Sequence, residues 1–320
     1  MIRIQYHPEL LEQAVWLAAR RDALTESSLH ATVDRIYELA PCDEREARFR
    51  RAFADWFTRL KLDRFLDEML SHFEGVVERI DAGMVRPTPR RKSEGAELFV
   101  RHDADLPRRT LVIQLCPESL TEPEIARDAM LRELQHVEDM LDEAFGYVPE
   151  SIDGLPSHQQ VVRDRYRILW DIRVEAILNR RGLLKCAAKP RLWSLFERAF
   201  TFAGFQPTRA LFQTVWDHEG GSHAQMFTWA IEPRKWLLAE MGQDHTGAQS
   251  GLGEPCPLCR FPTFDWCDWP NACDPRIEIN IRETVPEWRP ADGICRQCAE
   301  TLEAGAARKD RVVDPPDSNE

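Results

Sequence analysis

Four cysteines in the last quarter of the chain form two closely spaced pairs. One pair lies in the segment Cys-Pro-Leu-Cys at 256–259, and the other in Cys-Arg-Gln-Cys at 295–298. Two thiolates on one tight turn can share a metal ion, and two such turns complete the closed tetrahedral site that zinc prefers. The pattern therefore predicts one structural zinc ion. Its ligands would be Cys256, Cys259, Cys295 and Cys298.

The surrounding segment resembles the zinc ribbon family, with Cys-Pro-Leu-Cys as the first knuckle and Gly-Ile-Cys-Arg-Gln-Cys (293–298) as the second. A module of about 50 residues rarely supports its own core, so metal binding would supply much of the folding energy. The long segment between the knuckles also carries Cys267 and Cys273. Either cysteine could replace a ligand or remain a spare thiol. Zinc ribbons serve as nucleic-acid binders, protein adaptors or structural caps, so the resemblance alone does not define the function.

A second group of residues with chemical potential lies near the middle of the chain. The segment Arg132-Glu-Leu-Gln-His136 matches the metallopeptidase pattern His-Glu-x-x-His at Glu133 and His136 but not at its first position. In the intact pattern both histidines bind zinc, and the glutamate activates the metal-bound water as a general base. Arg132 has no lone pair to offer a metal. A catalytic metal is therefore expected to be weakly bound or absent.

The order of expected elements around this segment resembles the zincin fold, over roughly residues 96–182. These elements are a helical leader, a strand pair, the motif helix and a second long helix. The resemblance implies that Glu133 is the general base and His136 a zinc ligand. It also implies a third ligand from the second helix, either Glu175 or Asp171.

Three interpretations of this degenerate motif remain open. Arg132 could replace the zinc electrostatically by pairing with Glu175 or Asp171. Alternatively, a metal site could be rebuilt from His136, Asp139 and one of those carboxylates, with His218 or His223 as a further replacement ligand. In the third interpretation, the polar residues of the motif helix form an ion-paired or solvated face with no peptidase ancestry.

The elements that position these groups are predicted to be mostly helical. Apolar residues recur at helical spacing from His7 to about Ala82. The proline-containing basic run Arg86–Gly95 then predicts an exposed linker. Two strand-like runs, Ala96–Arg101 and Thr110–Leu115, can pair as a hairpin.

Two long helices should follow the hairpin. Thr121 and Glu124 form a capping-box pattern that predicts a helix to about Ala144. The second helix should run from about Gln159 to Arg181 and end at Gly182.

These predictions combine into an α+β fold that is mainly helical, a zincin-like domain with a small strand element joined to a zinc-ribbon module. The expected segments are a helical N-terminal region at 1–85, a zincin-like domain at 96–245, a zinc ribbon at 251–304 and a disordered tail at 305–320.

Composition limits the choice of partner. The 320 residues include 42 Lys and Arg against 54 Asp and Glu, a net charge of −12 that does not favour nucleic acid. No run approaches the ~20 apolar residues that span a bilayer, and no signal peptide is recognisable. We therefore expect a cytoplasmic protein with a protein partner and no membrane association.

These observations favour a binding or adaptor protein that holds structural zinc and lacks peptidase activity. The alternative is a metal-dependent hydrolase or peptidase with a rearranged ligand set and Glu133 as general base. The sequence contains no G-x-S-x-G elbow, P-loop or G-x-G-x-x-G fingerprint, which excludes the commonest hydrolase and nucleotide-binding sites.

Overall fold

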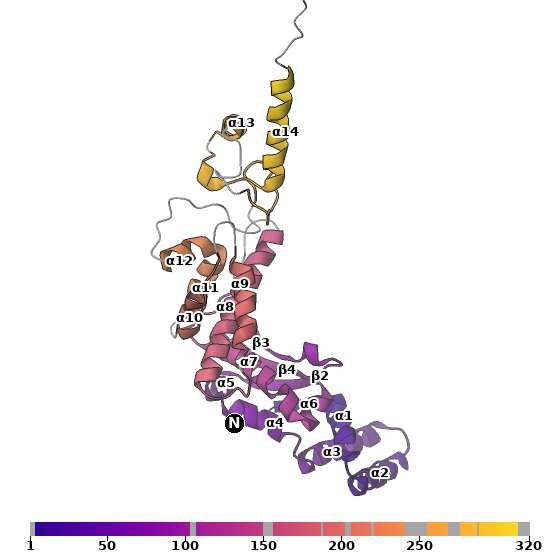
Figure 1. Cartoon of the computed structure of the whole chain (residues 1–320). Coiled ribbons are helices and arrows are strands. Elements are labelled where there is room, and N and C mark those ends of the chain that lie inside the picture. The colour runs from indigo at the N-terminus through magenta and orange to yellow at the C-terminus, as the bar shows by residue number, and fades with distance from the viewer. Residues whose placement is uncertain are drawn as a thin grey trace, which may run out of the picture. The chain divides into compact units, whose positions relative to one another are not determined.

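The computed structural model describes residues 4–102, 107–149, 156–186, 188–201, 206–218, 221–240, 255–267, 276–286 and 288–312. These residues are mostly helical and contain one four-stranded mixed sheet, which confirms the predicted α+β, mainly helical class (Figure 1). The chain divides into two compact units. Unit 1 comprises Met1–Tyr147 and Ile177–Ala187, and unit 2 comprises Val148–Ala176 and Ala188–Glu320.

Five helices of unit 1 follow its first strand, in the region where apolar residues recur at helical spacing. They are α1 (Pro8–Ala19), α2 (Ala23–Tyr37), α3 (Asp43–Arg59), α4 (Arg64–Ser71) and α5 (Glu74–Arg79). The Asp22 side chain caps α2 by accepting a hydrogen bond from the Thr25 amide (2.9 Å). The aromatic stripe of α3 is buried, with Phe53, Trp56 and Phe57 between 3% and 6% exposed. These aromatics therefore form part of the core.

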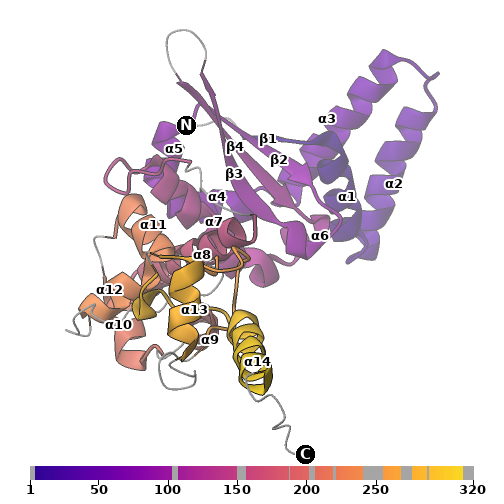
Figure 2. The same ribbon diagram turned by 90° about the horizontal axis from the view of Figure 1, so that it is seen from above.

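The sheet of unit 1 has the strand order β1-β2-β4-β3 (Figure 2). The strands are β1 (Ile4–Tyr6), β2 (Ala82–Pro87), β3 (Gly95–His102) and β4 (Pro107–Leu115). Strands β1, β2 and β4 are parallel neighbours, and β3 pairs antiparallel with β4 in a register that places Ala96 opposite Ile113. The predicted hairpin is confirmed.

Strands β1 and β2 were not predicted. The expected linker is also wrong at its start, because Arg86 and Pro87 end β2 and pair with Gln114 and Leu115 of β4. Parallel pairing joins segments that are far apart along the chain, so no local pattern announces it.

Helices α6 (Pro117–Thr121) and α7 (Pro123–Leu141) follow the sheet, and the predicted capping box is wrong. Thr121 is the last residue of α6, and its hydroxyl donates to the Glu118 carbonyl (3.0 Å). Glu122 precedes a proline, which disfavours helical dihedrals, and it adopts φ −130° and ψ 66°. The chain therefore breaks before α7 begins.

Unit 2 contains most of the long helix α8 (Pro156–Arg180), whose last turn is counted with unit 1. Gly182 follows α8 with φ +65°, so the predicted glycine stop is confirmed. The sequence places Ser222 directly after a Gly-Gly break, which predicts a helix cap there, and Ser222 does cap α11 (His223–Ile231) by accepting from the Gln225 amide (3.2 Å). The pattern from Ser222 to about Met241 predicts one last helix, but the chain forms two here, because Pro233 starts a new one. The four bundle helices after α8 are α9 (Lys189–Phe200), α10 (Arg209–Asp217), α11 (His223–Ile231) and α12 (Pro233–Glu240).

The C-terminal part of unit 2 carries α13 (Arg276–Thr284) and α14 (Arg296–Val312). Helix α14 includes residues 305–312, which were expected to belong to a disordered tail, and residues 313–320 lie outside the described residues. The expected boundary near 242–254 also lies outside them. Among the described helices, none combines the length and the apolar character needed to cross a bilayer.

Candidate metal centre

The thiol sulfurs of Cys256, Cys259, Cys295 and Cys298 lie within 4.8 Å of one another. The Sγ atoms of Cys256 and Cys298 are 3.9 Å apart, and those of Cys259 and Cys295 are 3.8 Å apart. A tetrahedral site with Zn–S bonds of about 2.3 Å holds its sulfurs about 3.8 Å apart. Within the described part of the chain, this is the only group of three or more His, Cys, Asp or Glu side chains with converging ligand atoms. The two sequence pairs therefore meet with the spacing of a four-thiolate centre.

The first knuckle is a short hairpin that folds back on itself. The Cys256 amide donates to the Phe261 carbonyl (2.9 Å), and the Arg260 amide donates to the Cys256 carbonyl (2.8 Å). Arg260, which directly follows the second cysteine, has φ +61°. Left-handed backbone favours glycine, so this arginine carries local strain.

Replacing Arg260 with glycine should therefore tighten the centre. The Arg260 side chain is exposed and makes no hydrogen bond or ion pair with another described residue, whereas the strain relieved is about 1 kcal/mol. We expect Arg260→Gly to bind zinc about fivefold more tightly in a competition titration with a chromogenic chelator. Arg260→Val should bind more weakly, because a β-branched residue tolerates this conformation least. Equal affinities for the three proteins would contradict the prediction.

The second knuckle follows Gly293, whose dihedrals of φ 62° and ψ 177° are accessible essentially to glycine alone. The Cys298 amide donates to the Cys295 sulfur (3.4 Å), and the Cys295 amide donates to the Cys256 sulfur (3.4 Å). The second of these hydrogen bonds joins the two knuckles. Asp265 also accepts from the Arg296 amide through its carbonyl (2.9 Å), which holds the second knuckle in place.

Hydrogen bonds from backbone N–H groups influence the protonation of the cluster. Burial alone would raise the pKa of Cys256, but amides of Cys295, Cys259 and Leu258 donate to its sulfur and together lower that pKa. Burial, together with a hydrogen bond to the neighbouring Cys295 thiol, raises the pKa of Cys298 well above its usual range. The Cys256 thiol therefore loses its proton more readily than an ordinary cysteine, and the Cys298 thiol loses its proton less readily. A divalent cation would supply the positive charge that four adjacent thiolates need.

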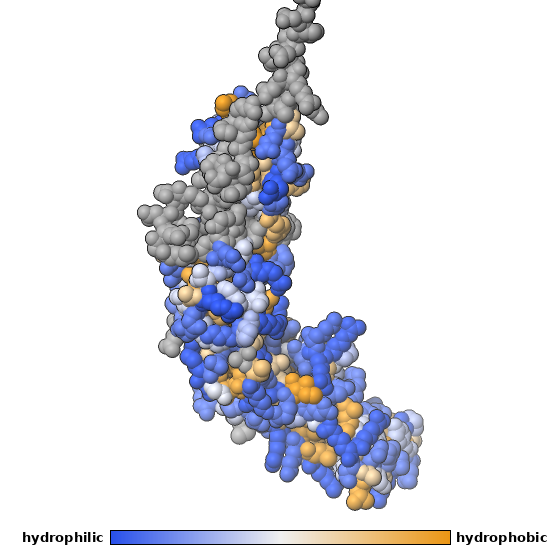
Figure 3. Space-filling view, in the orientation of Figure 1, coloured by the Kyte–Doolittle hydropathy of each residue, from blue (hydrophilic) through white to orange (hydrophobic). Residues whose placement is uncertain are grey.

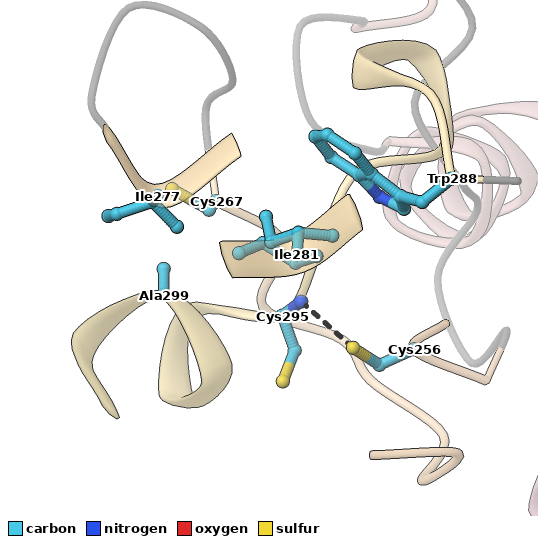
Figure 4. Close-up of a cluster of buried hydrophobic side chains, with 8 residues drawn as sticks. Cys256, Cys267, Ile277, Ile281, Trp288, Cys295 and Ala299 are labelled. Carbon is cyan, nitrogen blue, oxygen red and sulfur yellow. Dashed lines mark hydrogen bonds between the residues drawn. The ribbon is translucent and has the colours of Figure 1, made fainter. Parts of the chain in front are cut away.

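The excursion between the knuckles forms a small hydrophobic core around the cluster (Figure 4). Ile277 and Ile281 of α13, Trp288, and Ala299 of α14 are at most 3% exposed. The Trp288 indole N–H donates to the Gly293 carbonyl (3.0 Å), so the ring also positions the second knuckle. The long excursion therefore supplies the apolar material that a minimal module lacks.

The remaining aromatic and cysteine side chains of this module differ in burial and in bonding. Trp266 is 4% exposed, whereas Phe261 and Phe264 are 72% and 57% exposed. Cys267 is disulfide-bonded and is not one of the four clustered sulfurs. Cys273 and Trp269 lie outside the described residues.

Comparisons with models of protein families, with curated proteins and with solved structures find no match to this chain. The four-cysteine cluster is therefore defined by its own geometry.

The motif predicted in unit 1 lies on α7. Arg132, Glu133 and His136 are half-buried, and Asp139 is buried. An Arg132 Nη2 hydrogen donates to the Cys186 carbonyl (3.3 Å) in the segment after α8. The Glu133 carboxylate faces β3, because a Cβ atom added at Gly95 would lie 3.5 Å from Glu133 Oε2.

The carboxylates predicted to complete a second centre lie on α8, in unit 2. Glu175 is 1% exposed, and its Oε1 accepts a hydrogen bond from the Ala188 amide at the start of α9. Asp171 is half-buried and lines a groove between α8 and α9. A site built from these side chains and His136 or Asp139 would join the two units, and it stays a prediction.

The two later histidines have partners inside unit 2. His223 is 3% exposed, and its Nδ1 lies 2.7 Å from the Tyr166 hydroxyl. His218 Nε2 lies 3.2 Å from the Gln225 side-chain oxygen. Their predicted role as replacement ligands also stays untested.

A polar network on α7 beside the motif was not predicted from the sequence. An Arg181 Nη1 hydrogen donates to Gln135 Oε1 (3.2 Å) and lies 3.5 Å from Glu138 Oε2, while the guanidinium lies 5.0 Å from the Phe73 ring centre. Arg181 directly follows α8, and a basic residue before a helix-ending glycine was the only available signal. Burial raises the pKa of Glu138, and Arg181 offsets only part of that rise.

Glu138 should make stability depend on pH. Because the folded-state pKa of this carboxyl is raised, the folded protein holds its proton to higher pH than the unfolded chain does, and stability falls as pH rises through that interval. We expect Glu138→Gln to match the wild type near pH 4 and to be more stable at pH 7 by less than about 1 kcal/mol. Urea unfolding at several pH values measures the difference, and a variant less stable at pH 7 would contradict it.

Proposed function

We propose that the four-cysteine cluster is a zinc ribbon that holds one structural zinc ion, and that the chain is a binding or adaptor protein without peptidase activity. The sulfur separations of 3.8 and 3.9 Å carry the metal assignment. Four thiolates fill a tetrahedral zinc ion and leave no position for water or substrate, so this metal would stabilise rather than catalyse.

The motif helix supports the absence of peptidase activity. Arg132 stands where the intact metallopeptidase pattern has its first histidine, and a guanidinium cannot ligate zinc. Its hydrogen bond to the Cys186 carbonyl gives this arginine a structural task within unit 1. In this proposal the helix descends from a zincin-like ancestor, and Arg132 paired with Asp171 or Glu175 takes over the role of the lost metal.

A metal-dependent hydrolase is the second candidate. It is favoured by the position of Glu133, whose carboxylate lies beside the side-chain-free Gly95 of an edge strand and could serve as general base. The metal would be held by His136, Asp139 and either Glu175 or Asp171.

Metal counting on the full-length protein separates the two candidates. We expect one zinc per chain by inductively coupled plasma mass spectrometry in the wild type and in His136→Ala, and none in a Cys256→Ser/Cys298→Ser variant. The hydrolase candidate instead requires a second metal in the wild type that His136→Ala loses. It also requires a hydrolytic activity that Glu133→Gln abolishes while the metal stays bound.

A further inference from the structure

We infer that unit 1 carries a groove for a lysine- and arginine-rich segment of a partner protein. This inference rests on the binding role proposed above, and it names the chemistry of the partner. The groove has a volume of about 980 Å³ and lies between α1, α2, the end of β2 and α6. A smaller hollow of about 390 Å³ between α1, α2 and α3 continues it, because both are lined by Glu12, Trp16 and His30.

The walls of the groove carry excess negative charge. Four carboxylates line the main groove against the single cation Arg20. These carboxylates belong to Glu9, Glu12, Glu26 and Glu118. Within the described part of unit 1, no Lys, Arg or His side chain lies within ion-pair distance of any of them. Their charge is therefore available to a positively charged ligand.

The carboxylates are distributed along the groove rather than gathered at one point. Glu9 and Glu12 lie on α1, Glu26 on α2 and Glu118 on α6. They do not form a converging ligand set, since the only such set in the described residues is the cysteine cluster. A single metal ion could therefore not contact several of these carboxylates at once. An extended segment with several spaced cations can pair with each of them.

Two wall residues suit a peptide. Trp16 lines both hollows, with its ring centre 4.9 Å from that of His30, and an indole ring can attract a lysine or arginine side chain. Thr88 is 5% exposed, and its amide donates to the Leu115 carbonyl (3.0 Å). Thr88 lines the groove, and among the described residues its hydroxyl has no hydrogen-bond partner. This hydroxyl can bond to the backbone of a bound segment.

The surface around the groove favours a partner recognised by its charge and restricts where in the groove that partner can lie. Among the residues coloured in Figure 3, hydrophilic ones predominate and hydrophobic ones lie in small separate patches. Arg86 and Arg90 are exposed and flank Pro87–Pro89 at one edge of the groove. A basic segment would be repelled at this edge and held toward α1, α2 and α6.

The test is a binding titration on the full-length, zinc-loaded protein. The probe is a fluorescein-labelled peptide in which lysine and arginine alternate with glycine and serine, followed by fluorescence anisotropy. We expect saturable binding that weakens with added salt.

The triple variant Glu12→Gln/Glu26→Gln/Glu118→Gln should weaken peptide binding about tenfold, because three partly exposed ion pairs are lost. The matched control Glu78→Gln removes an exposed carboxylate of α5 that does not line the groove, and it should bind as the wild type does.

The inference is overturned if the peptide does not bind, or if the triple variant binds as tightly as Glu78→Gln. It is also overturned if a peptide with glutamine in place of every lysine and arginine binds equally well, or if spermine binds the groove more tightly than the peptide. Thr88→Val supplies a variant that leaves every charge in place, and we expect it to weaken peptide binding two- to threefold. Cys295→Ser keeps the two proposals apart. If this variant still binds the peptide after losing its zinc, the groove works independently of the metal centre. Failure of the zinc proposal would then not overturn this inference.

Discussion

Replacing Cys295 with serine should remove the bound zinc and unfold the ribbon module. Cys295 contributes one of the four clustered sulfurs, and its amide also donates to the Cys256 sulfur. Structural zinc contributes on the order of 10 kcal/mol to the folding of a small module, more than a core of this size can supply. Zinc content by mass spectrometry and the near-ultraviolet circular dichroism of the buried Trp266 and Trp288 measure the two losses.

Cys186→Ser is the matched control for this prediction, because Cys186 is a free, exposed cysteine of unit 1. It should keep both the zinc and the tryptophan signal. A Cys295→Ser protein with a full equivalent of zinc at wild-type affinity would show that the cluster is not the metal centre.

Truncating Phe196 should destabilise the helical part of unit 2 by about 3–5 kcal/mol. Phe196 is 0% exposed, and its ring lies between 4.6 and 6.5 Å from four other rings, measured between centroids. These rings belong to Trp193, Phe200, Phe212 and Trp236. Phe196→Ala would leave a cavity that this aromatic cluster cannot close. Guanidinium unfolding followed by tryptophan fluorescence gives the change in free energy.

Phe264→Ala is the control in the same unit, since Phe264 is 57% exposed. We expect it to change the free energy of unfolding by less than about 0.5 kcal/mol. If both variants lost equal stability, the assignment of Phe196 to a buried core would be incorrect.

Features that depend on neighbours in the chain were predictable from the sequence. The spacing of Cys256 and Cys259, and of Cys295 and Cys298, is set by the geometry of a tight turn, so each pair was recognisable before the fold was known. The β3–β4 hairpin, the Ser222 cap and the Gly182 stop are equally local. In each case a few consecutive residues contain the whole physical cause.

Features that depend on distant segments were decided by the tertiary structure. Strand β1 finds its partner β2 only after five intervening helices, and Arg181 reaches Gln135 across 46 positions. The acidic groove draws carboxylates from α1, α2 and α6, which no spacing rule connects. Even the capping-box pattern at Thr121 was overruled by Pro123 and the separate helix α6. The sequence by itself therefore determined the turns and the two cysteine pairs. Only the packing of the whole unit decided which distant charges and strands meet. The reason is that burial of the shared core and pairing of backbone strands join residues that are far apart in the sequence.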